Sequence, residues 1–205
     1  MTAGSDCPGL TFIRTEMTFE EDIKNAVETL KRGGVILYPT DTVWGIGCDA
    51  SNAKAVKRVY EIKRRADSKA LIVLVGNRND LYRYVDEVPD VAMELIDVSV
   101  RPTTVIYDRA INMADNVIAE DGSVAIRVTS DRYCQQLCRA LRRPLVSTSA
   151  NISGTPAPAL FREIAPEIIN AADYVAEHRR NDNERSEPSI IIKISADSTF
   201  KIIRK

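Results

Sequence analysis

Short apolar runs alternate with amphipathic stretches along the whole chain. Apolar runs predict strands at residues 35–38, 70–75, 103–107, 124–128, 144–149, 173–176, 189–194 and 200–203. Apolar positions at helical spacing predict helices that begin after Thr18, Ser51 and Asp131, and others over residues 79–98, broken at Pro89, and 158–172. This alternation predicts one α/β domain, because 205 residues suit a single domain of that class.

The most informative stretch runs from Gly33 to Gly47. An apolar strand leads into Pro39, which lacks a backbone donor and therefore ends regular sheet pairing. The short polar side chains of Thr40-Asp41-Thr42 follow, at the kind of strand end where open α/β sheets bind ligands. Trp44 and two glycines come next, and glycine permits close approach of the backbone. The same residues are ordinary in a capped turn, so this stretch alone leaves both interpretations open.

Three further polar clusters interrupt the apolar pattern. Arg127 stands in the middle of the 124–128 strand, on the face away from the apolar residues, where it requires an internal or bound anion. The run Lys63-Arg64-Arg65, with Lys69, precedes the 70–75 strand; it suits a polyphosphate, and it equally suits a helix C-terminus. The third cluster, Ser147, Ser149 and Asn151, lines one side of an extended strand end.

Composition excludes several classes of protein. Hydrophobic residues make up 44% and charged residues 28%, as in a folded globular protein rather than a disordered one. The formal net charge is −1, so any contact with nucleic acid needs a local basic patch. No apolar run is long enough to span a bilayer, and no signal peptide is evident, which predicts a cytoplasmic protein. Cys134 and Cys138 are spaced to hold half a metal site, but there is no second cysteine pair and His178 is the only histidine, so we expect buried, reduced thiols and no protein-bound metal.

The common catalytic and nucleotide-binding motifs are absent from the sequence. Neither the phosphate-binding loop Gly-x-x-x-x-Gly-Lys-Ser/Thr nor the dinucleotide fingerprint Gly-x-Gly-x-x-Gly occurs. A Gly-x-Ser-x-Gly elbow is also missing, and the lone His178 lies in a charged segment, which argues against a Ser-His hydrolase. Cations and hydroxyls without a protein nucleophile suit a reaction in which the substrate supplies the nucleophile.

Four ordered motifs carry a family resemblance. They are Tyr38-Pro-Thr-Asp-Thr-Val-Trp-Gly-Ile-Gly, Lys63-Arg-Arg65, Val124-Ala-Ile-Arg-Val and Ser147-Thr-Ser-Ala-Asn-Ile-Ser-Gly, and together they resemble the YrdC family of threonylcarbamoyl-AMP synthases. The resemblance implies a twisted, mixed open sheet with flanking helices around a positively lined cavity. It also implies that L-threonine, bicarbonate and ATP react to give threonylcarbamoyl-AMP and pyrophosphate for the threonylcarbamoyladenosine modification of tRNA.

The resemblance also implies roles for individual residues. The catalytic pair would be Lys63 and Arg65, and the ATP-binding set would be Lys63, Arg65, Lys69, Ser123, Ser149 and Asn151. Threonine would be bound by Thr42, Arg127, Ser147 and Ser189, with Arg127 facing its carboxylate. Mg²⁺ would accompany ATP, bound mainly by substrate oxygens and water rather than by a protein carboxylate cage. Departures from the family pattern, such as Val100-Arg101-Pro102 and Leu74, concern single contacts.

The resemblance covers nearly the whole chain and implies a single-domain form, with a core over about residues 18–205 and flexible residues 1–10. Two alternatives stay open: an RNA-binding module of the same fold without catalysis, and carbamoyl adenylation like that of the hydrogenase maturation protein HypF. Candidate macromolecular partners are tRNA and the downstream tRNA-modification proteins. Residues 178–187 are charged and lack apolar content, which predicts a mobile loop and suggests a lid over the cavity.

Overall fold

The computed structural model describes residues 17–65, 71–195 and 199–205. The predicted alternation of helices and strands is confirmed. In chain order the elements are α1 (Phe19–Lys31), β1 (Ile36–Tyr38), β2 (Gly45–Gly47), α2 (Ala53–Ile62), β3 (Ile72–Val75), the 3-10 helix η1 (Arg78–Arg83), α3 (Asp90–Val98), β4 (Thr103–Tyr107), η2 (Asp115–Val117), β5 (Val124–Val128), α4 (Arg132–Leu141), β6 (Leu145–Ser149), η3 (Phe161–Glu163), α5 (Pro166–Ala171), β7 (Tyr174–Val175), β8 (Ile190–Ile194) and β9 (Phe200–Arg204).

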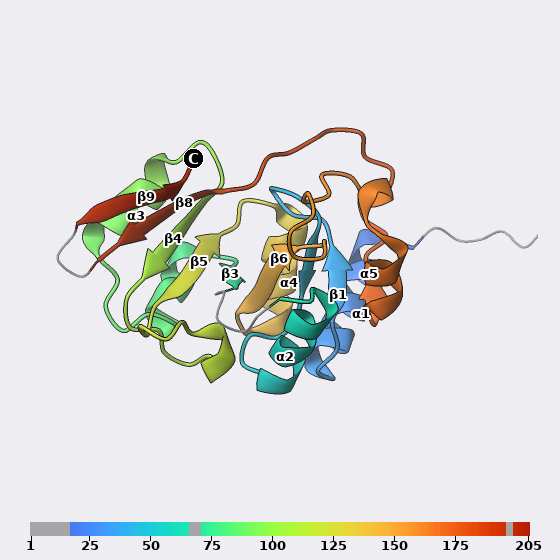
Figure 1. The fold of residues 1–205 in the computed structure, drawn as a ribbon, viewed down its shortest axis with the longest axis horizontal. Helices are drawn as coiled ribbons and strands as arrows, with labels where there is room; N and C mark the ends of the chain where they lie inside the picture. The colour runs from blue at the N-terminus through green and yellow to red at the C-terminus, as the bar shows by residue number, and fades with distance from the viewer. Residues whose placement is uncertain (1–16, 66–70, 196–198) are drawn as a thin grey trace, which may run out of the picture.

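The strands form one twisted, mixed sheet in the order β7-β1-β2-β6-β3-β5-β4-β8-β9 (Figure 1). The pairs β1–β7, β3–β5 and β4–β8 are parallel, and the other neighbours are antiparallel. Consecutive strands are therefore often not neighbours, and β6 lies between β2 and β3. This order brings the polar end of β6 next to the Gly45–Gly47 strand that follows the Thr40-Asp41-Thr42 corner.

Helix α1 begins with a complete capping box. The Thr18 hydroxyl accepts from the Glu21 backbone N–H, and the Glu21 carboxylate accepts from the Thr18 backbone N–H. The predicted cap of the next helix, Ser51, is wrong by one residue. The Asn52 side chain caps α2, whereas the Ser51 hydroxyl donates to Asp49 (2.6 Å). Asp131 caps α4 as predicted, accepting from the Cys134 backbone N–H.

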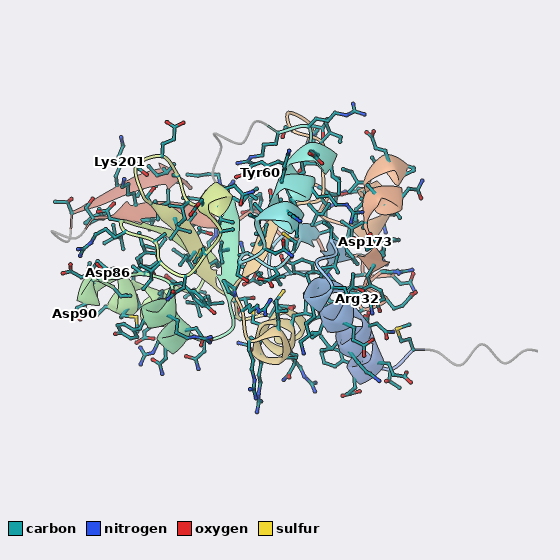
Figure 2. The ribbon with its side chains drawn as sticks, turned by 90° about the horizontal axis from the view of Figure 1, so that it is seen from below. Arg32, Tyr60, Asp86, Asp90, Asp173 and Lys201 are labelled. Atoms are coloured by element: carbon teal, nitrogen blue, oxygen red, sulfur yellow. The ribbon has the colours of Figure 1, made fainter. Side chains whose placement is uncertain are left out.

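The two faces of the sheet have different covers. One face carries Val73, Ile126 and Val146 and packs in a cluster with α2. The other face carries Ile36, Leu74 and Leu145 beneath α1 and α4. Figure 2 shows α2, which carries Tyr60, and α1, which ends near Arg32, on opposite sides of the strands. Because successive residues of a strand alternate between faces, Arg127 lies on the face of α1 and α4, beyond the edge of their cover.

Several sequence-based boundaries need correction. The predicted helix over residues 158–172 is only η3 and the short α5, because Pro166 occupies the first position of α5 and separates the two. Helical spacing from Val91 and Leu95 would place Val98 on the buried side of its helix, but Val98 is 73% exposed at the end of α3. Strand β2 was not predicted; its two glycines flank a single buried isoleucine, which gives no alternation over a useful length.

Gly47 is required by the close packing of β2 on β6. A Cβ atom at this position would lie 1.9 Å from the Val146 carbonyl oxygen, which accepts a hydrogen bond from the Tyr38 hydroxyl (3.1 Å). Only glycine permits this approach of the two backbones.

Residues 176–189 connect β7, at one edge of the sheet, to β8, near the other (Figure 1). The connection has no helix or strand, as predicted, but ion pairs hold it to the domain. Arg179 donates to the Thr40 carbonyl (3.1 Å) and to Asp131 (3.2 Å), and Glu187 pairs with Arg101 (2.9 Å). His178 stacks on Tyr133, with ring centroids 5.2 Å apart.

Cys48, Cys134 and Cys138 are buried, free thiols, as expected, and Cys7 lies outside the described residues. Within the part of the chain that the structure describes, no helix combines the length and the apolar character needed to cross a membrane.

Candidate active site

A cavity of about 270 Å³ opens on the part of the sheet face that α1 and α4 leave uncovered. Its floor comes from alternate residues of neighbouring strands, namely Ile72, Ala125, Arg127, Ser147 and Ser149. The same face thus carries apolar side chains under the helices and polar ones where it is open. The remaining lining residues come from the loops and the C-terminal hairpin: Thr42, Val43, Gly45, Arg65, Ile106, Thr148, Ala157, Pro188, Ser189, Ile191, Ile203 and Arg204.

The Thr40-Asp41-Thr42 corner forms one wall and is rigidly hydrogen-bonded. The Thr40 hydroxyl lies 2.9 Å from the Thr42 hydroxyl and accepts from the Thr42 backbone N–H (3.0 Å). It also contacts the Val43 carbonyl at 2.9 Å. Both threonines are buried, so the turn holds the Thr42 hydroxyl in a fixed position at the cavity. The capped-turn and ligand-site interpretations of this stretch are therefore compatible.

Arg127 and Asp41 form a buried ion pair at the cavity floor. Asp41 Oδ1 lies 3.0 Å from Arg127 Nη2, and their side chains are 7% and 4% exposed. The internal anion that a mid-strand arginine requires is therefore present. Arg127 lines the cavity, and its buried Nε has no hydrogen-bond partner among the described residues.

The predicted phosphate-binding cluster gathers around Lys63, just after α2. Lys63 is 1% exposed, and its ammonium donates to the carbonyl oxygens of Ser149 and Asn151 (2.8 Å to Asn151) and to Asn151 Oδ1 (3.3 Å). Burial, with a smaller contribution from the neighbouring Arg65 charge, lowers the pKa of Lys63 from 10.5 to about 7. The Lys63 ammonium therefore points into the protein and does not extend to the solvent.

Arg65 and Ser149 extend this cluster into the cavity. Arg65 lines the cavity, and burial lowers the pKa of its guanidinium. The Ser149 hydroxyl is bonded to Asn151 Oδ1, and the Asn151 amide donates to the Thr155 carbonyl (2.6 Å). The bonds fix the turn that follows β6, so Lys63, Arg65, Ser149 and Asn151 lie together although they come from two distant parts of the chain.

The C-terminal hairpin closes the opposite wall. The Ser189 hydroxyl lies 2.8 Å from the Thr104 hydroxyl, and both side chains are buried. Arg204 on β9 donates through Nε (3.1 Å) and Nη2 (2.8 Å) to the Ser189 carbonyl and lines the cavity. Sequence reasoning missed Arg204, because its approach to Ser189 depends on the antiparallel pairing of β8 with β9, and the predicted strand ended at residue 203.

One predicted site residue is not brought to the cavity, and the outcome for another is not described. Ser123 is buried just before β5, but it is not among the lining residues, and its hydroxyl donates to Asp121 (2.5 Å). Lys69 lies outside the described residues. The other eight, Thr42, Lys63, Arg65, Arg127, Ser147, Ser149, Asn151 and Ser189, line the cavity or bond directly to residues that do.

Fold and site together define a mixed α/β domain with a cavity on its open sheet face, lined in part by arginine and hydroxyl side chains. The chain belongs to the Sua5/YciO/YrdC family, because the model of that family, described as telomere recombination, matches residues 28–205.

Curated relatives support the same assignment. A threonylcarbamoyl-AMP synthase of Vibrio cholerae is 35% identical over 164 residues, which cover 78% of this chain and 87% of the relative. Another synthase of that name, from Pseudoalteromonas translucida, is 33% identical over 178 residues, covering 85% of this chain and 94% of the relative.

Solved structures confirm the fold. The E. coli YciO structure superposes with a TM-score of 0.77 at 24% identity, covering 89% of this chain and 88% of that one. P. abyssi Sua5 in complex with L-threonine gives a TM-score of 0.76 at 24% identity and covers 86% of this chain. This chain spans about half (51%) of that Sua5 chain. A full-length HypF in a phosphate- and nucleotide-bound form gives 0.76 at 20% identity.

Proposed function

We propose that this chain is an L-threonylcarbamoyladenylate synthase, a nucleotidyltransferase that makes threonylcarbamoyl-AMP and pyrophosphate from L-threonine, bicarbonate and ATP. The observation that carries the proposal is one cavity lined by Arg65, Arg127 and several hydroxyl side chains, with Lys63 bonded to the backbone of Ser149 and Asn151 at its edge. Arg127 with Thr42, Ser147 and Ser189 suits an amino acid carboxylate, and Lys63 with Arg65, Ser149 and Asn151 suits phosphates. The synthase names of the curated relatives support this assignment.

The reaction needs no nucleophile from the protein. The amine of threonine adds to carbon dioxide derived from bicarbonate and loses a proton, which gives a carbamate. One carbamate oxygen then attacks the α-phosphorus of ATP, the bond to the β-phosphate oxygen breaks, and pyrophosphate leaves. The protein positions the two reactants and neutralises the charge that develops on the phosphates. Arg127 binds the threonine carboxylate, and Lys63 and Arg65 bind the triphosphate.

Mg²⁺ accompanies ATP in this proposal. The described residues contain no group of three or more histidine, cysteine or acidic side chains that would hold a metal ion. Asp41, the carboxylate beside the cavity, is already paired with Arg127. The residues therefore fit an ion that is bound by substrate phosphate oxygens and water. When bound, the ion neutralises part of the triphosphate charge.

The product is an activated acyl adenylate, so it requires an acceptor. We propose that it serves the threonylcarbamoyladenosine modification of tRNA in the cytoplasm, by a single domain that spans the chain. Contacts with tRNA itself and with downstream modification proteins belong to the same proposal. Ser123 and Lys69 stay predictions for the nucleotide site.

Pyrophosphate release from ATP and Mg²⁺ tests the proposal, with threonine and bicarbonate each present or omitted. Release that requires both supports the synthase. Release that instead requires carbamoyl phosphate indicates HypF-like carbamoyl adenylation. No release from a folded sample contradicts both enzymes and favours the RNA-binding module. The Arg65→Ala variant is the control, because Arg65 lines the cavity and its loss should stop release without unfolding the chain.

A further inference from the structure

Asp41 occupies an unusual position for an acidic residue, beside a cavity proposed to bind two anions. Its Oδ1 pairs with Arg127 Nη2 at 3.0 Å. Its Oδ2 accepts from the Thr129 hydroxyl (3.2 Å) and the Ser130 backbone N–H (3.4 Å). Oδ1 is buried and accepts no hydrogen bond from the described residues, so its contact with Arg127 is an ion pair alone. Asp41 therefore connects the β1 corner, the middle of β5 and the turn before α4, but it does not face the cavity itself.

Arg127 is the group that this arrangement controls. Its backbone is fixed by pairing of β5 with both β3 and β4. Its long side chain still has several rotatable bonds, and Asp41 is the only ion-pair partner that the described residues give it. With Nη2 held by Asp41, the guanidinium stays at the cavity floor, which Arg127 lines. A substrate carboxylate there would meet a guanidinium that is already oriented.

A second guanidinium near Arg127 makes its orientation by Asp41 necessary. Arg204 lines the same cavity, held in place by the Ser189 carbonyl. Burial, and then the nearby charge of Arg127, lower the pKa of Arg204. Without Asp41, two arginines would repel each other in a confined space, and the one that is not anchored to a carbonyl, Arg127, would move away.

We propose that Asp41 is a positioning residue for substrate binding: it holds the Arg127 guanidinium beside Arg204 so that Arg127 receives the threonine carboxylate. The inference rests on the proposed function. Two opposite effects are separable by experiment. Loss of Asp41 removes an anion that repels the substrate carboxylate, which strengthens binding, but it also releases Arg127, which weakens binding. The buried ion pair on Oδ1 and the two hydrogen bonds on Oδ2 make the second effect the larger one.

Asp41→Asn is the direct test. In the Asp41 carboxylate, Oδ1 forms the ion pair with Arg127 and Oδ2 accepts two hydrogen bonds, whereas an amide has a single acceptor oxygen. Either orientation of the amide places its NH₂ group against a donor, Arg127 Nη2 on one side or the Ser130 backbone N–H on the other.

The chain offers a closely matched control in Asp49. This carboxylate is also buried, pairs with Arg143 (2.6 Å) through Oδ2, and accepts from the Ser51 backbone N–H (2.9 Å) and hydroxyl through Oδ1. It does not line the cavity. Asp49→Asn therefore repeats the chemical change at a distance from the site.

The measurement is calorimetric binding of L-threonine and of threonine amide, in which a neutral carboxamide replaces the carboxylate. We expect Asp41→Asn to weaken threonine binding roughly 10- to 100-fold. Binding of threonine amide should change by less than about threefold, so the preference for the carboxylate collapses. Asp49→Asn should leave both affinities within about threefold of wild type, even if it lowers thermal stability as much as Asp41→Asn does.

Several results would overturn the inference. Threonine binding by Asp41→Asn that equals or exceeds wild type would show that repulsion outweighs positioning. Equal losses for threonine and its amide would show a merely structural role. If Asp41→Asn does not fold, Asp41→Glu replaces it, because the longer side chain keeps the charge but displaces the guanidinium; unchanged carboxylate preference there overturns the inference too. A wild-type protein that binds no threonine would instead refute the proposed function, and this inference with it.

Discussion

Lys63 provides a quantitative test of the site. Its pKa is about 7 in the folded protein because burial disfavours the charged ammonium. In the unfolded chain the side chain is in water, and its pKa returns to the ordinary value of 10.5. Below pH 7 both states bind the proton, so the cost of burying the charge is fully present. Between pH 7 and 10.5 the unfolded state binds more protons than the folded state, and stability therefore rises with pH. The whole difference corresponds to ~5 kcal/mol.

The perturbation is Lys63→Met, compared with wild type by urea unfolding at pH 7 and pH 9. In the variant, three carbonyl oxygens lose the Lys63 ammonium as hydrogen-bond donor, and this loss destabilises the variant equally at both pH values. The difference in unfolding free energy between wild type and variant should therefore shift by about 2 kcal/mol in favour of wild type from pH 7 to pH 9. Lys57→Met is the control, because the Lys57 side chain is 68% exposed, and its curves should stay parallel to wild type.

If the difference in unfolding free energy between wild type and Lys63→Met stays constant within about 0.5 kcal/mol from pH 7 to pH 9, the conclusion that Lys63 is buried with a lowered pKa is refuted. Ligand binding gives a second readout of the same group. A triphosphate beside Lys63 favours its charged form, so ATP binding at pH 8 should take up close to one proton per site. Calorimetry in buffers of different ionisation enthalpy measures that uptake, and it should vanish in Lys63→Met.

Three further predictions concern other parts of the molecule. Arg65→Ala should lower the rate of pyrophosphate release at least about 100-fold with an unchanged circular dichroism spectrum; a rate near wild type would remove Arg65 from the site. Gly47→Ala should destabilise the fold by ~3 kcal/mol or more in urea, because the new Cβ would lie 1.9 Å from the Val146 carbonyl oxygen. Gly122→Ala is the control: the new Cβ would meet no atom within 4 Å, and only the positive φ of 79° disfavours alanine there. This variant should therefore lose about 1 kcal/mol of stability. Asp22→Asn should cost about 1 to 3 kcal/mol, since the buried carboxylate accepts from the Tyr174 hydroxyl (2.5 Å) and the His178 backbone N–H (2.8 Å); an unchanged midpoint would contradict this.

Local patterns predicted the parts of the site that depend on local geometry. Alternation along residues 124–128 placed Arg127 on the face opposite to Ile126, and the structure confirms this, because the side-chain period of a strand does not depend on its partners. The corner after Tyr38 followed from Pro39 and the short polar side chains in the same way.

Features that depend on distant pairing could not be predicted from local patterns. The depth at which Lys63 is buried follows from the carbonyls of Ser149 and Asn151, which are 86 and 88 residues away in sequence. The place of Arg204 in the cavity likewise depends on Ser189 and the register of the final hairpin. The choice of Asn52 over Ser51 as helix cap was decided by Asp49, whose carboxylate engages the serine.

The connection between β7 and β8 also constrains how the chain folds. Six strands lie between these two in the sheet order, so residues 176–189 cross roughly 34 Å of sheet at the usual strand spacing. At full extension they reach only about 50 Å, so little slack remains. Once β7 is paired with β1, the connection therefore spans the sheet only in a largely extended form. High sequence separation of this kind slows folding, and we expect the hairpin that carries Ser189 and Arg204 to pair last. The cavity would then be the last part of the molecule to form.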